Sequence, residues 1–247
     1  VSLFKTFAGP SNYRAYGSSY RTLPNATDAC AFVDPAVGTD INVDIPVGST
    51  FVAAYMYWSG SGDDDLAQTD SDVTLVDPSL TSFGISADEP FLIKNVGGGN
   101  NLDFFTGYKD VSAIVNANGI YTMQDLTAQS GVPWQTTSAC AAGWALVVVF
   151  ENPLEEIKVL NLFHGFQPFQ NKSFDLVPRN FRIRAFEVGN GIPHGQLTHI
   201  TVEGDNTPTL NINEALGLQD APGSPTFNFL TNTFNPTDAH YNDTISR

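Results

Sequence analysis

Five aspartates within ten residues form a dense group of potential ligands. They follow the segment YMYWSGSG and are Asp63, Asp64, Asp65, Asp70 and Asp72. Calcium takes about six to eight oxygen ligands, which carboxylates and carbonyls supply. Because side chains alternate along a strand, the last two should share one face of a returning strand. The spacing matches neither an EF-hand loop nor a calcium-binding nonapeptide. Two interpretations therefore stay open: a calcium site on these five carboxylates, or a solvated acidic hairpin.

A polar strip is expected on the segment 196–203. His199, Thr201 and Glu203 alternate onto one face of a strand there. A transition-metal site would need a second converging ligand, and His194 is too loosely placed to supply it. We therefore expect an exposed polar strand.

Motifs of catalysis are missing from the sequence. WSGSGD lacks the spacing of a nucleophile elbow, and no H-E-x-x-H, P-loop or dinucleotide fingerprint occurs. His164 and His240 stand alone, and no carboxylate pair is singled out for glycoside hydrolysis. We expect that the protein is not an enzyme.

Aromatic residues offer a second kind of binding surface. Tyr55 and Tyr57 should share one face of a strand, with Met56 and Trp58 on the other. Alternation of this kind is typical of the core of a β-sandwich, so we expect most aromatics to be buried. The exception is Trp134 in the loop GVPWQTT, a candidate platform on which a glycan ring stacks.

The first residues, VSLFKTF, have a strand-like pattern. The candidate assembly residues are Val1, Leu3, Phe4 and Phe7. A strand at this position either pairs within its own sheet or completes the sheet of a neighbouring copy by β-strand addition. We expect this segment to begin a mature chain from which a secretion signal has been removed.

Composition limits the class of partner. The chain of 247 residues has 26 acidic and 11 basic residues, for a formal charge of −15. Nucleic acids and anionic membranes are therefore poor partners. The longest apolar run, residues 141–150, is about half the length that a membrane-spanning helix needs and reads instead as a buried strand.

The two cysteines, Cys30 and Cys140, allow one intramolecular bridge. An intracellular protein keeps such a pair as thiols, but low lysine content and N-x-S/T triplets at Asn25, Asn171 and Asn242 favour an extracellular chain. We therefore predict a disulfide. It would close a loop of roughly 110 residues and contribute about 4 to 5 kcal/mol on the chain-entropy model.

Short strands separated by Gly, Pro, Asn and Asp clusters predict an all-β protein, a β-sandwich or jelly roll. We expect one large β domain over residues 1–247, or a core sandwich over 1–166 with an appended lobe over 167–247. Short helices are predicted only within 107–119 and 212–218. Strands are predicted at 2–7, 41–45, 49–58, 72–75, 91–95, 102–105, 119–126, 143–151, 157–166, 174–176, 183–187 and 196–203.

Several phrases together are similar to one known family. AAYMYWSGSGDDD, DVSAIVNANGIYTMQDL, AGWALVVVFENP and VLNLFHGFQ resemble the β-rich domain of large secreted bacterial surface proteins, which often precedes stalk repeats of a domain of unknown function. The resemblance covers roughly residues 48–246. It implies an extracellular, adhesin-like or matrix protein and carries over no catalytic residue. His164 departs from the pattern, because this chain has FHGF where the family has Asp.

These observations predict a secreted cell-surface structural protein, a subunit of an extracellular filament or matrix or an adhesin. Its partners would be further copies of itself or other cell-surface proteins. The alternative is a calcium-dependent carbohydrate-binding module built on the aspartate stretch and a nearby aromatic ring.

Overall fold

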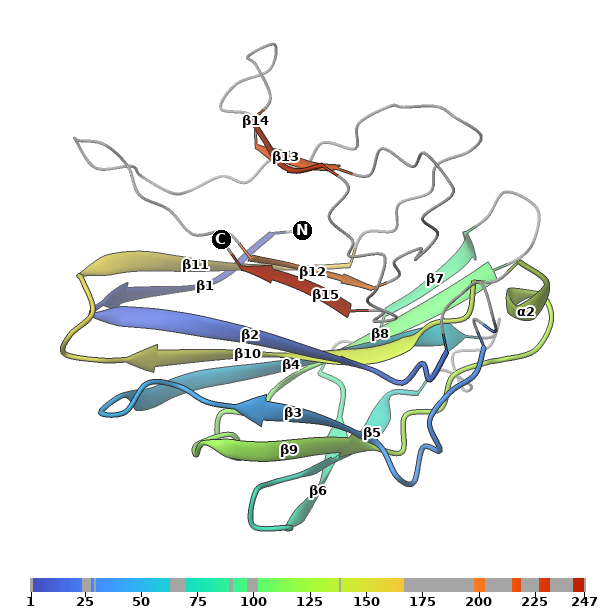
Figure 1. Cartoon of the computed structure of the whole chain (residues 1–247), viewed down its shortest axis with the longest axis horizontal. Helices are drawn as coiled ribbons and strands as arrows, with labels where there is room; N and C mark the ends of the chain where they lie inside the picture. Colours follow the sequence, from blue (N-terminus) through green and yellow to red (C-terminus); the bar gives the residue numbers. More distant parts are fainter. Residues whose placement is uncertain are drawn as a thin grey trace.

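The computed structural model describes residues 2–23, 28, 30–62, 70–88, 91–96, 102–137, 139–166, 198–202, 215–218, 227–231 and 242–246. Nearly all regular structure in these ranges is antiparallel β, and the helix α2, Trp134–Thr137, spans four residues (Figure 1). The prediction of an all-β sandwich is confirmed. Within the same ranges, no helix is long and apolar enough to cross a membrane.

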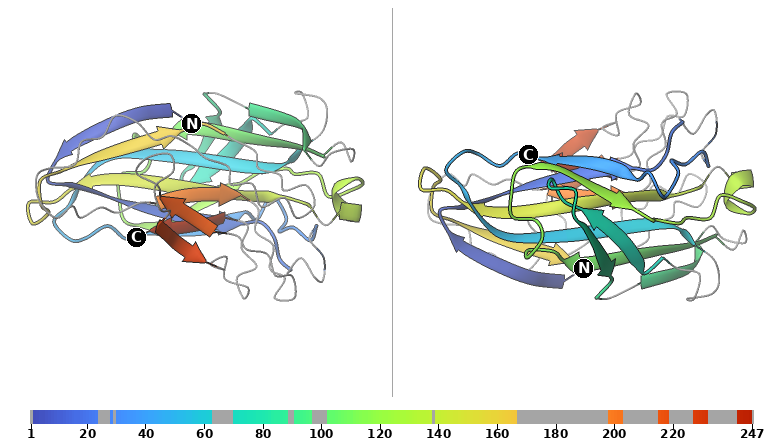
Figure 2. Two further views of the ribbon diagram at one scale, coloured as in Figure 1. Left: turned by 90° about the horizontal axis from the view of Figure 1, so that it is seen from above. Right: turned by 90° about the horizontal axis from the view of Figure 1, so that it is seen from below.

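Two sheets form the sandwich. In Figure 1 the five-stranded sheet lies in the middle of the molecule and the four-stranded sheet lies below it. Figure 2 shows the four-stranded sheet from below. The five-stranded order is β2 (Ser11–Ser19), β10 (Ala142–Glu151), β4 (Thr50–Gly62), β8 (Leu102–Asp110) and β7 (Phe91–Val96). The four-stranded order is β3 (Thr39–Val43), β9 (Gly119–Gln124), β5 (Asp72–Val76) and β6 (Ser82–Ser86).

Two-stranded ribbons add a third layer over the outer face of the five-stranded sheet (Figures 1 and 2). One ribbon pairs β1 (Ser2–Gly9) with β11 (Lys158–His164), and another pairs β12 (Thr198–Val202) with β15 (Asn242–Ser246). A further pair, β13 (Ala215–Leu218) and β14 (Phe227–Thr231), lies farther from the sheets in Figure 1. The described strands after residue 166 pair only with one another.

The sequence of β10 explains why three layers are needed. Its segment AGWALVVVF is apolar at every position, and all nine residues are buried. Trp144, Leu146 and Val148 point into the core between the two sheets. Val149, on the opposite face, packs with β-ribbon residues in a second apolar cluster. A strand that is apolar on both faces must be covered on both, and the third layer supplies the second cover.

The neighbouring strand β4 shows the alternation that the sequence predicted. Met56 and Trp58 lie in the inter-sheet core, whereas Tyr55 belongs to the cluster on the outer face. Trp58 pairs in register with Gly107 of β8, and a Cβ atom at Gly107 would lie 2.2 Å from the indole ring. Only glycine therefore fits opposite this tryptophan. The indole Nε1 donates to the carbonyl oxygen of Asp70 at 2.8 Å, which fixes the start of the segment leading into β5.

Strands β1 and β2 pair with β11 and β10 as one long ribbon that folds back on itself. The pairs run from Ser2 with His164 to Gly9 with Lys158, and then continue from Ser11 with Glu151 along β2 and β10. The fold-back therefore lies at residues 9–11 on one strand and 151–158 on the other. It turns the first half of the ribbon over the outer face of the sheet.

Asn152 holds this fold-back. Its side chain is buried, and its amide donates to Ser49 Oγ at 3.0 Å while its Oδ1 accepts the N–H of Leu154 at 2.9 Å. Its own N–H donates to the carbonyl oxygen of Pro10 at 2.9 Å. One residue therefore joins both halves of the corner to the turn before β4, which gives a physical reason for asparagine in the phrase FENP.

Several predictions of secondary structure were wrong. The predicted helix within 107–119 is the end of β8 followed by one tight turn, in which the N–H groups of Ile114 and Val115 both donate to the carbonyl of Val111. The predicted helical turn at 212–218 is strand β13 where the structure describes it. Strands β2 and β6 were not predicted. The strands predicted at 174–176 and 183–187 lie outside the described residues.

Replacing the corner residue tests this account of the ribbon. Asn152→Ala should lower the free energy of unfolding by about 1–3 kcal/mol, because it removes the hydrogen bonds of a buried side chain to Ser49 Oγ and to the N–H of Leu154. Urea denaturation would measure the change. Asn116→Ala is the matched control, since Asn116 is exposed and its side-chain amide donates to the nearby carbonyl of Ala113 at a long 3.4 Å. An equal loss in both variants would contradict the role given to Asn152.

Candidate functional site

The predicted acidic site lies only partly within the described structure. Asp63, Asp64 and Asp65 lie outside the described residues. Asp72 is the first residue of β5, and Asp70 lies two residues before it. Asp70 is half-buried and Asp72 is exposed, so the two carboxylates differ in environment although they are two residues apart.

Protein donors already occupy these two carboxylates. Oδ2 of Asp70 accepts the N–H of Thr127, and Oδ1 of Asp72 accepts the hydroxyl of Ser86 at 2.5 Å. Asp125 lies near enough to Asp70 to raise its pKa, and it accepts the hydroxyl of Thr74 at 2.6 Å. Among the described residues, no group of three or more ligating side chains is arranged for a metal ion. Calcium binding stays a prediction.

Asp70 is nevertheless electrostatically unusual. Burial of its carboxyl, together with the neighbouring charges of Asp72 and Asp125, raises its pKa from 3.8 to about 6. Hydrogen bonding from Thr127 acts in the opposite direction but does not cancel the effect. The folded protein therefore carries an unfavourable negative charge here at neutral pH.

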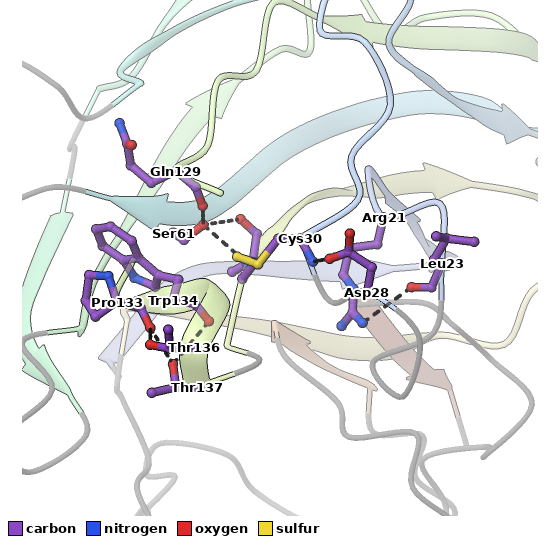
Figure 3. Close-up of a disulfide and its surroundings, with 12 residues drawn as sticks. Arg21, Leu23, Asp28, Cys30, Ser61, Gln129, Pro133, Trp134, Thr136 and Thr137 are labelled. Atoms are coloured by element: carbon purple, nitrogen blue, oxygen red, sulfur yellow. Dashed lines mark hydrogen bonds between the residues drawn. A yellow bond between two sulfur atoms is a disulfide. The ribbon is translucent and has the colours of Figure 1, made fainter. Parts of the chain in front are cut away.

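The disulfide lies at one end of the sandwich. Cys30 and Cys140 are bonded across a sequence separation of 110, as the sequence predicted. The bridge joins the connection between β2 and β3 to the residues before β10. Figure 3 shows it beside Ser61 and Trp134, whose ring forms a small apolar cluster with Cys140 and Leu102.

Trp134 does not fit the predicted role in glycan stacking. Its side chain is only 5% exposed, and its Nε1 donates to the carbonyl of Asp103 at 3.0 Å. A sugar ring needs an accessible aromatic face, and this ring is packed against the disulfide region instead. The prediction failed because a tryptophan in a short polar loop looks exposed in the sequence, whereas its packing partners come from β8 and from the residues before β10.

An aromatic cluster lies between the β1–β11 ribbon and the five-stranded sheet. Phe4 stacks on His164 with ring centroids 4.4 Å apart, and it meets Tyr108 and Tyr55 edge-on at 5.3 and 5.5 Å. Tyr57 adjoins the same cluster, with its ring 5.4 Å from that of Tyr108. We call the four rings that surround Phe4 in this cluster, Tyr55, Tyr57, Tyr108 and His164, the aromatic seat. His164, which stands alone in the sequence, is therefore packed against aromatic rings in the fold.

One hydroxyl in the aromatic seat is exceptional. The Tyr57 Oη atom is buried, and no described residue provides it with a hydrogen-bond partner. Burial raises the pKa of Tyr57 far above its ordinary value, because the ionised form would be poorly solvated. The phenol therefore stays neutral at physiological pH.

The predicted assembly strand is paired within its own chain. Leu3, Phe4 and Phe7 lie on β1, which pairs with β11 along its length, while Val1 lies outside the described residues. Phe4 and Phe7 pack toward the sheet together with Leu160 and Leu162 of β11. Leu3 is 41% exposed. In this structure the strand therefore pairs within its own chain, which is the first of the two alternatives that the sequence left open.

The other face of the ribbon has exposed apolar residues toward its two ends, with the polar pair Thr6 and Asn161 between them. Because Leu160 and Leu162 point to the sheet, the alternate residues of β11 point away from it. Among these, Val159 is 61% exposed, and Ile157 and Leu154 in the adjoining corner are 86% and 93% exposed. We call Leu3, Val159, Ile157 and Leu154 the outer strip.

Two cavities lie away from the aromatic seat. One, of about 350 Å³, lies near the disulfide and is lined by Tyr20 and Phe32 among others. The second, of about 380 Å³, contains the salt bridge between Arg14 and Asp44 at 2.5 Å. Arg14 holds the pKa of that carboxyl below its usual range. This contact ties β2 of one sheet to the end of β3 in the other.

The remaining candidates are the residues of the predicted polar strip and two further histidines. His199 and Thr201 lie on β12, and Glu203, His194 and His240 lie outside the described residues. Comparison with protein-family models, with curated proteins and with solved structures found no match to this chain. The resemblance to bacterial surface proteins therefore stays a prediction.

The raised pKa of Asp70 predicts a specific pH dependence. A carboxyl whose pKa is higher in the folded state than in the unfolded state stabilises the fold at pH below 3.8, and this contribution is lost as the pH rises through about 6. Asp70→Asn should therefore be more stable than the parent protein at pH 7, by about 1–2 kcal/mol after allowance for solvent screening. The advantage should disappear near pH 4.

Thermal or urea unfolding between pH 4 and 7.5 measures this difference. Asp77→Asn is the control, because hydrogen bonds from Ser79 and Thr81 lower the pKa of Asp77. The Asp77 carboxylate therefore stabilises the fold at neutral pH, and this stabilisation is lost only as the pH falls below 3.8. A parent protein and an Asp70→Asn variant of equal stability at pH 7 would rule out the unfavourable charge.

The buried hydroxyl of Tyr57 predicts that its removal does not destabilise the protein. Tyr57→Phe should be neutral or stabilise the protein by up to about 1 kcal/mol, because it removes a desolvated group with no partner. Tyr121→Phe is the matched control, since Tyr121 is fully buried and its hydroxyl donates to the Ala117 carbonyl at 3.0 Å. That control should lose about 1 kcal/mol in urea denaturation. A similar loss for Tyr57→Phe would mean that the hydroxyl has a partner.

Proposed function

We propose that this protein is a secreted structural subunit of the cell surface, part of an extracellular filament or matrix or an adhesin, that associates with other copies through the β1–β11 ribbon. The observation that carries the proposal is the combination of open strand edges and exposed apolar residues on this one ribbon. The prediction of β-strand addition from the sequence led to the same region.

The edges of the ribbon support strand addition. Among the described strands, β1 and β11 pair only with each other, so each has one edge whose backbone N–H and C=O groups lack a strand partner. Unprotected edges are the usual templates for pairing with another chain. Bulges and inward charges often protect such edges, and here the one irregularity is a register shift between Leu3 and Lys5.

The outer strip supports contact through side chains. Val159, Ile157 and Leu154 are more than half exposed and lie in one short stretch of the chain, with Glu155, Glu156 and Lys158 between them. Single apolar residues are normal on a surface, but several exposed apolar residues beside an open strand edge favour an interaction site.

Charge also favours this surface. A chain with a formal charge of −15 repels its own copies at neutral pH. Neither β1 nor β11 contains an acidic residue, and the two strands contain Lys5 and Lys158. Lys158 is paired with Glu155 at 2.8 Å. Two copies that meet along β1 and β11 therefore bring no carboxylate of these two strands together, whereas Glu155 and the exposed Glu156 lie among the residues of the outer strip.

The disulfide is consistent with this location. Stable structural disulfides occur mainly in proteins that fold in oxidising compartments or outside the cell. The Cys30–Cys140 bridge links two segments beside the core, in a position that suits a structural role.

A charge placed on the outer strip should weaken association. Val159→Glu removes an exposed apolar side chain and adds a repulsive charge, so we expect the dissociation constant for self-association to rise at least about tenfold, equivalent to 1.4 kcal/mol. Light scattering coupled to sizing, over a range of protein concentrations, measures this constant.

Val37→Glu is the matched control. Val37 is 64% exposed against 61% for Val159, and its carbonyl accepts a hydrogen bond from Gln124 in the four-stranded layer. The two variants therefore have the same residue change, exposure and net charge but lie on opposite layers. A parent protein that stays monomeric at the highest attainable concentration would refute the proposed function.

A further inference from the structure

We infer that β1 is exchanged between copies of this protein, so that β1 of one copy pairs with β11 of the next and places Phe4 and Phe7 over that copy's sheet. The inference rests on the proposed function and identifies the partner as a second copy of this chain. The exchange would use the same contacts that β1 now makes within its own chain.

The aromatic seat is incomplete without β1. Phe4 contacts rings from three other elements: Tyr55 on β4, Tyr108 on β8 and His164 on β11. Phe7 packs in the same apolar cluster. Removal of β1 would expose these rings and the edge of β11 together. The seat therefore needs a β1 segment, and any copy of the chain provides one with the correct shape.

The strand is held less firmly than its neighbours in the sheet. Five of its eight residues are exposed, and its pairing is one-sided. Strand β10, in contrast, pairs on both sides and has nine of ten residues buried. Elements with few buried side chains and solvent-exposed hydrogen bonds open at a lower free-energy cost than the global fold. We therefore expect β1 to leave while the sandwich stays folded.

The connection after β1 provides a natural hinge. Gly9 has a φ of 144°, a value that glycine adopts readily, and a Cβ atom there would meet nothing closer than 3.6 Å. The next residues are fixed, because the carbonyl of Pro10 accepts the N–H of Asn152 and Ser11 is 1% exposed. A change of backbone angles at Gly9 would release β1 and leave the corner intact.

Concentration should control the balance between the two forms. Closed and exchanged copies have the same strand pairing and the same seat, so they differ mainly in the hinge and in the entropy of association. A segment tethered by a short linker has an effective concentration in the millimolar range. Isolated copies at micromolar concentration should therefore stay closed, whereas crowded copies at a surface should exchange. Exchange that does not close into a ring produces a chain of subunits.

Mixed cysteine variants of the full chain test the exchange. Thr6 and Asn161 are register partners, and Thr6 Oγ1 donates to Asn161 Oδ1 at 2.9 Å on the exposed side of the ribbon. One preparation would hold Thr6→Cys and the other Asn161→Cys, and the two would be mixed at high concentration and then oxidised. Directly opposed strand residues approach closely enough for a disulfide. Exchange predicts a covalent link between positions 6 and 161 of different chains, identified by mass spectrometry.

An off-register pair provides the control. Val159 pairs with Ala8, two residues away from the partner of Thr6. A mixture of Thr6→Cys with Val159→Cys should give at least about fivefold less cross-link, since diagonal neighbours are farther apart than opposed residues. Equal cross-linking in both mixtures would indicate random collision and would overturn the exchange.

A locked variant separates the exchange from the proposed function. Thr6→Cys and Asn161→Cys in one chain, oxidised as a dilute monomer, would fix β1 in its own seat. Exchange predicts that the locked form no longer assembles and that mild reduction restores assembly, with parent protein under the same reductant as control.

The outcomes are distinct. Assembly of the locked form, or assembly of the mixed chains without a link between positions 6 and 161, would overturn the exchange and leave the proposed function standing. A parent protein that forms only monomers, with no link between chains in the mixture, would overturn both.

Discussion

The two-sided apolar character of β10 is the constraint on which the rest of the structure depends. Nine consecutive buried residues in an interior strand cannot be covered by one opposing sheet. The four-stranded sheet covers the face of Trp144 and Leu146, and the ribbons cover the face of Val149. Burial of apolar area is the main favourable contribution to folding, at about 25 cal/mol per Å². The third layer is therefore a consequence of the sequence of β10.

The connection of the β1–β11 ribbon to β2 and β10 determines which strand edges and side chains the ribbon leaves exposed. Strand β11 continues the chain directly from β10, and β1 precedes β2, so the ribbon that folds back at Asn152 is a continuation of the pairing between β2 and β10. A cover built in this way is only two strands wide. Its inner face packs against the aromatic seat, whereas its edges have no partner among the described strands and its outer strip is exposed. The same fold-back that completes the core creates the surface proposed for association.

The sequence predicted those parts of the fold that local patterns determine. Alternation in residues 53–58 identified the faces of Tyr55 and Trp58, and the unbroken apolar run identified β10. Strand β2 was missed because SNYRAYGSS mixes polar, aromatic and glycine residues and lies at the edge of its sheet. The apolar spacing of Val111, Ile114 and Val115 fits either a helix or a single turn. The segment forms a single turn, because it only connects β8 to the other sheet.

The candidate site was less predictable because its contacts join distant parts of the chain. Phe4 meets Tyr55, Tyr108 and His164, which lie on three different strands, and no local pattern indicates that these rings share one seat. The burial of Trp134 follows in the same way from Asp103 and Cys140. Sequence periodicity states which face of a strand is apolar, but it does not state which element covers that face.

Net charge and the ribbon together explain why association would be directional. A formal charge of −15 on a molecule of this size produces repulsion over most approaches between two copies. At physiological salt this repulsion is screened beyond about 8 Å, so it acts mainly at contact, where like charges must be desolvated. Strands β1 and β11 contain no carboxylate, and their exposed edges offer backbone hydrogen bonds that do not depend on charge. Repulsion elsewhere would then act as a filter, because it disfavours non-specific contacts while contact at the ribbon is retained.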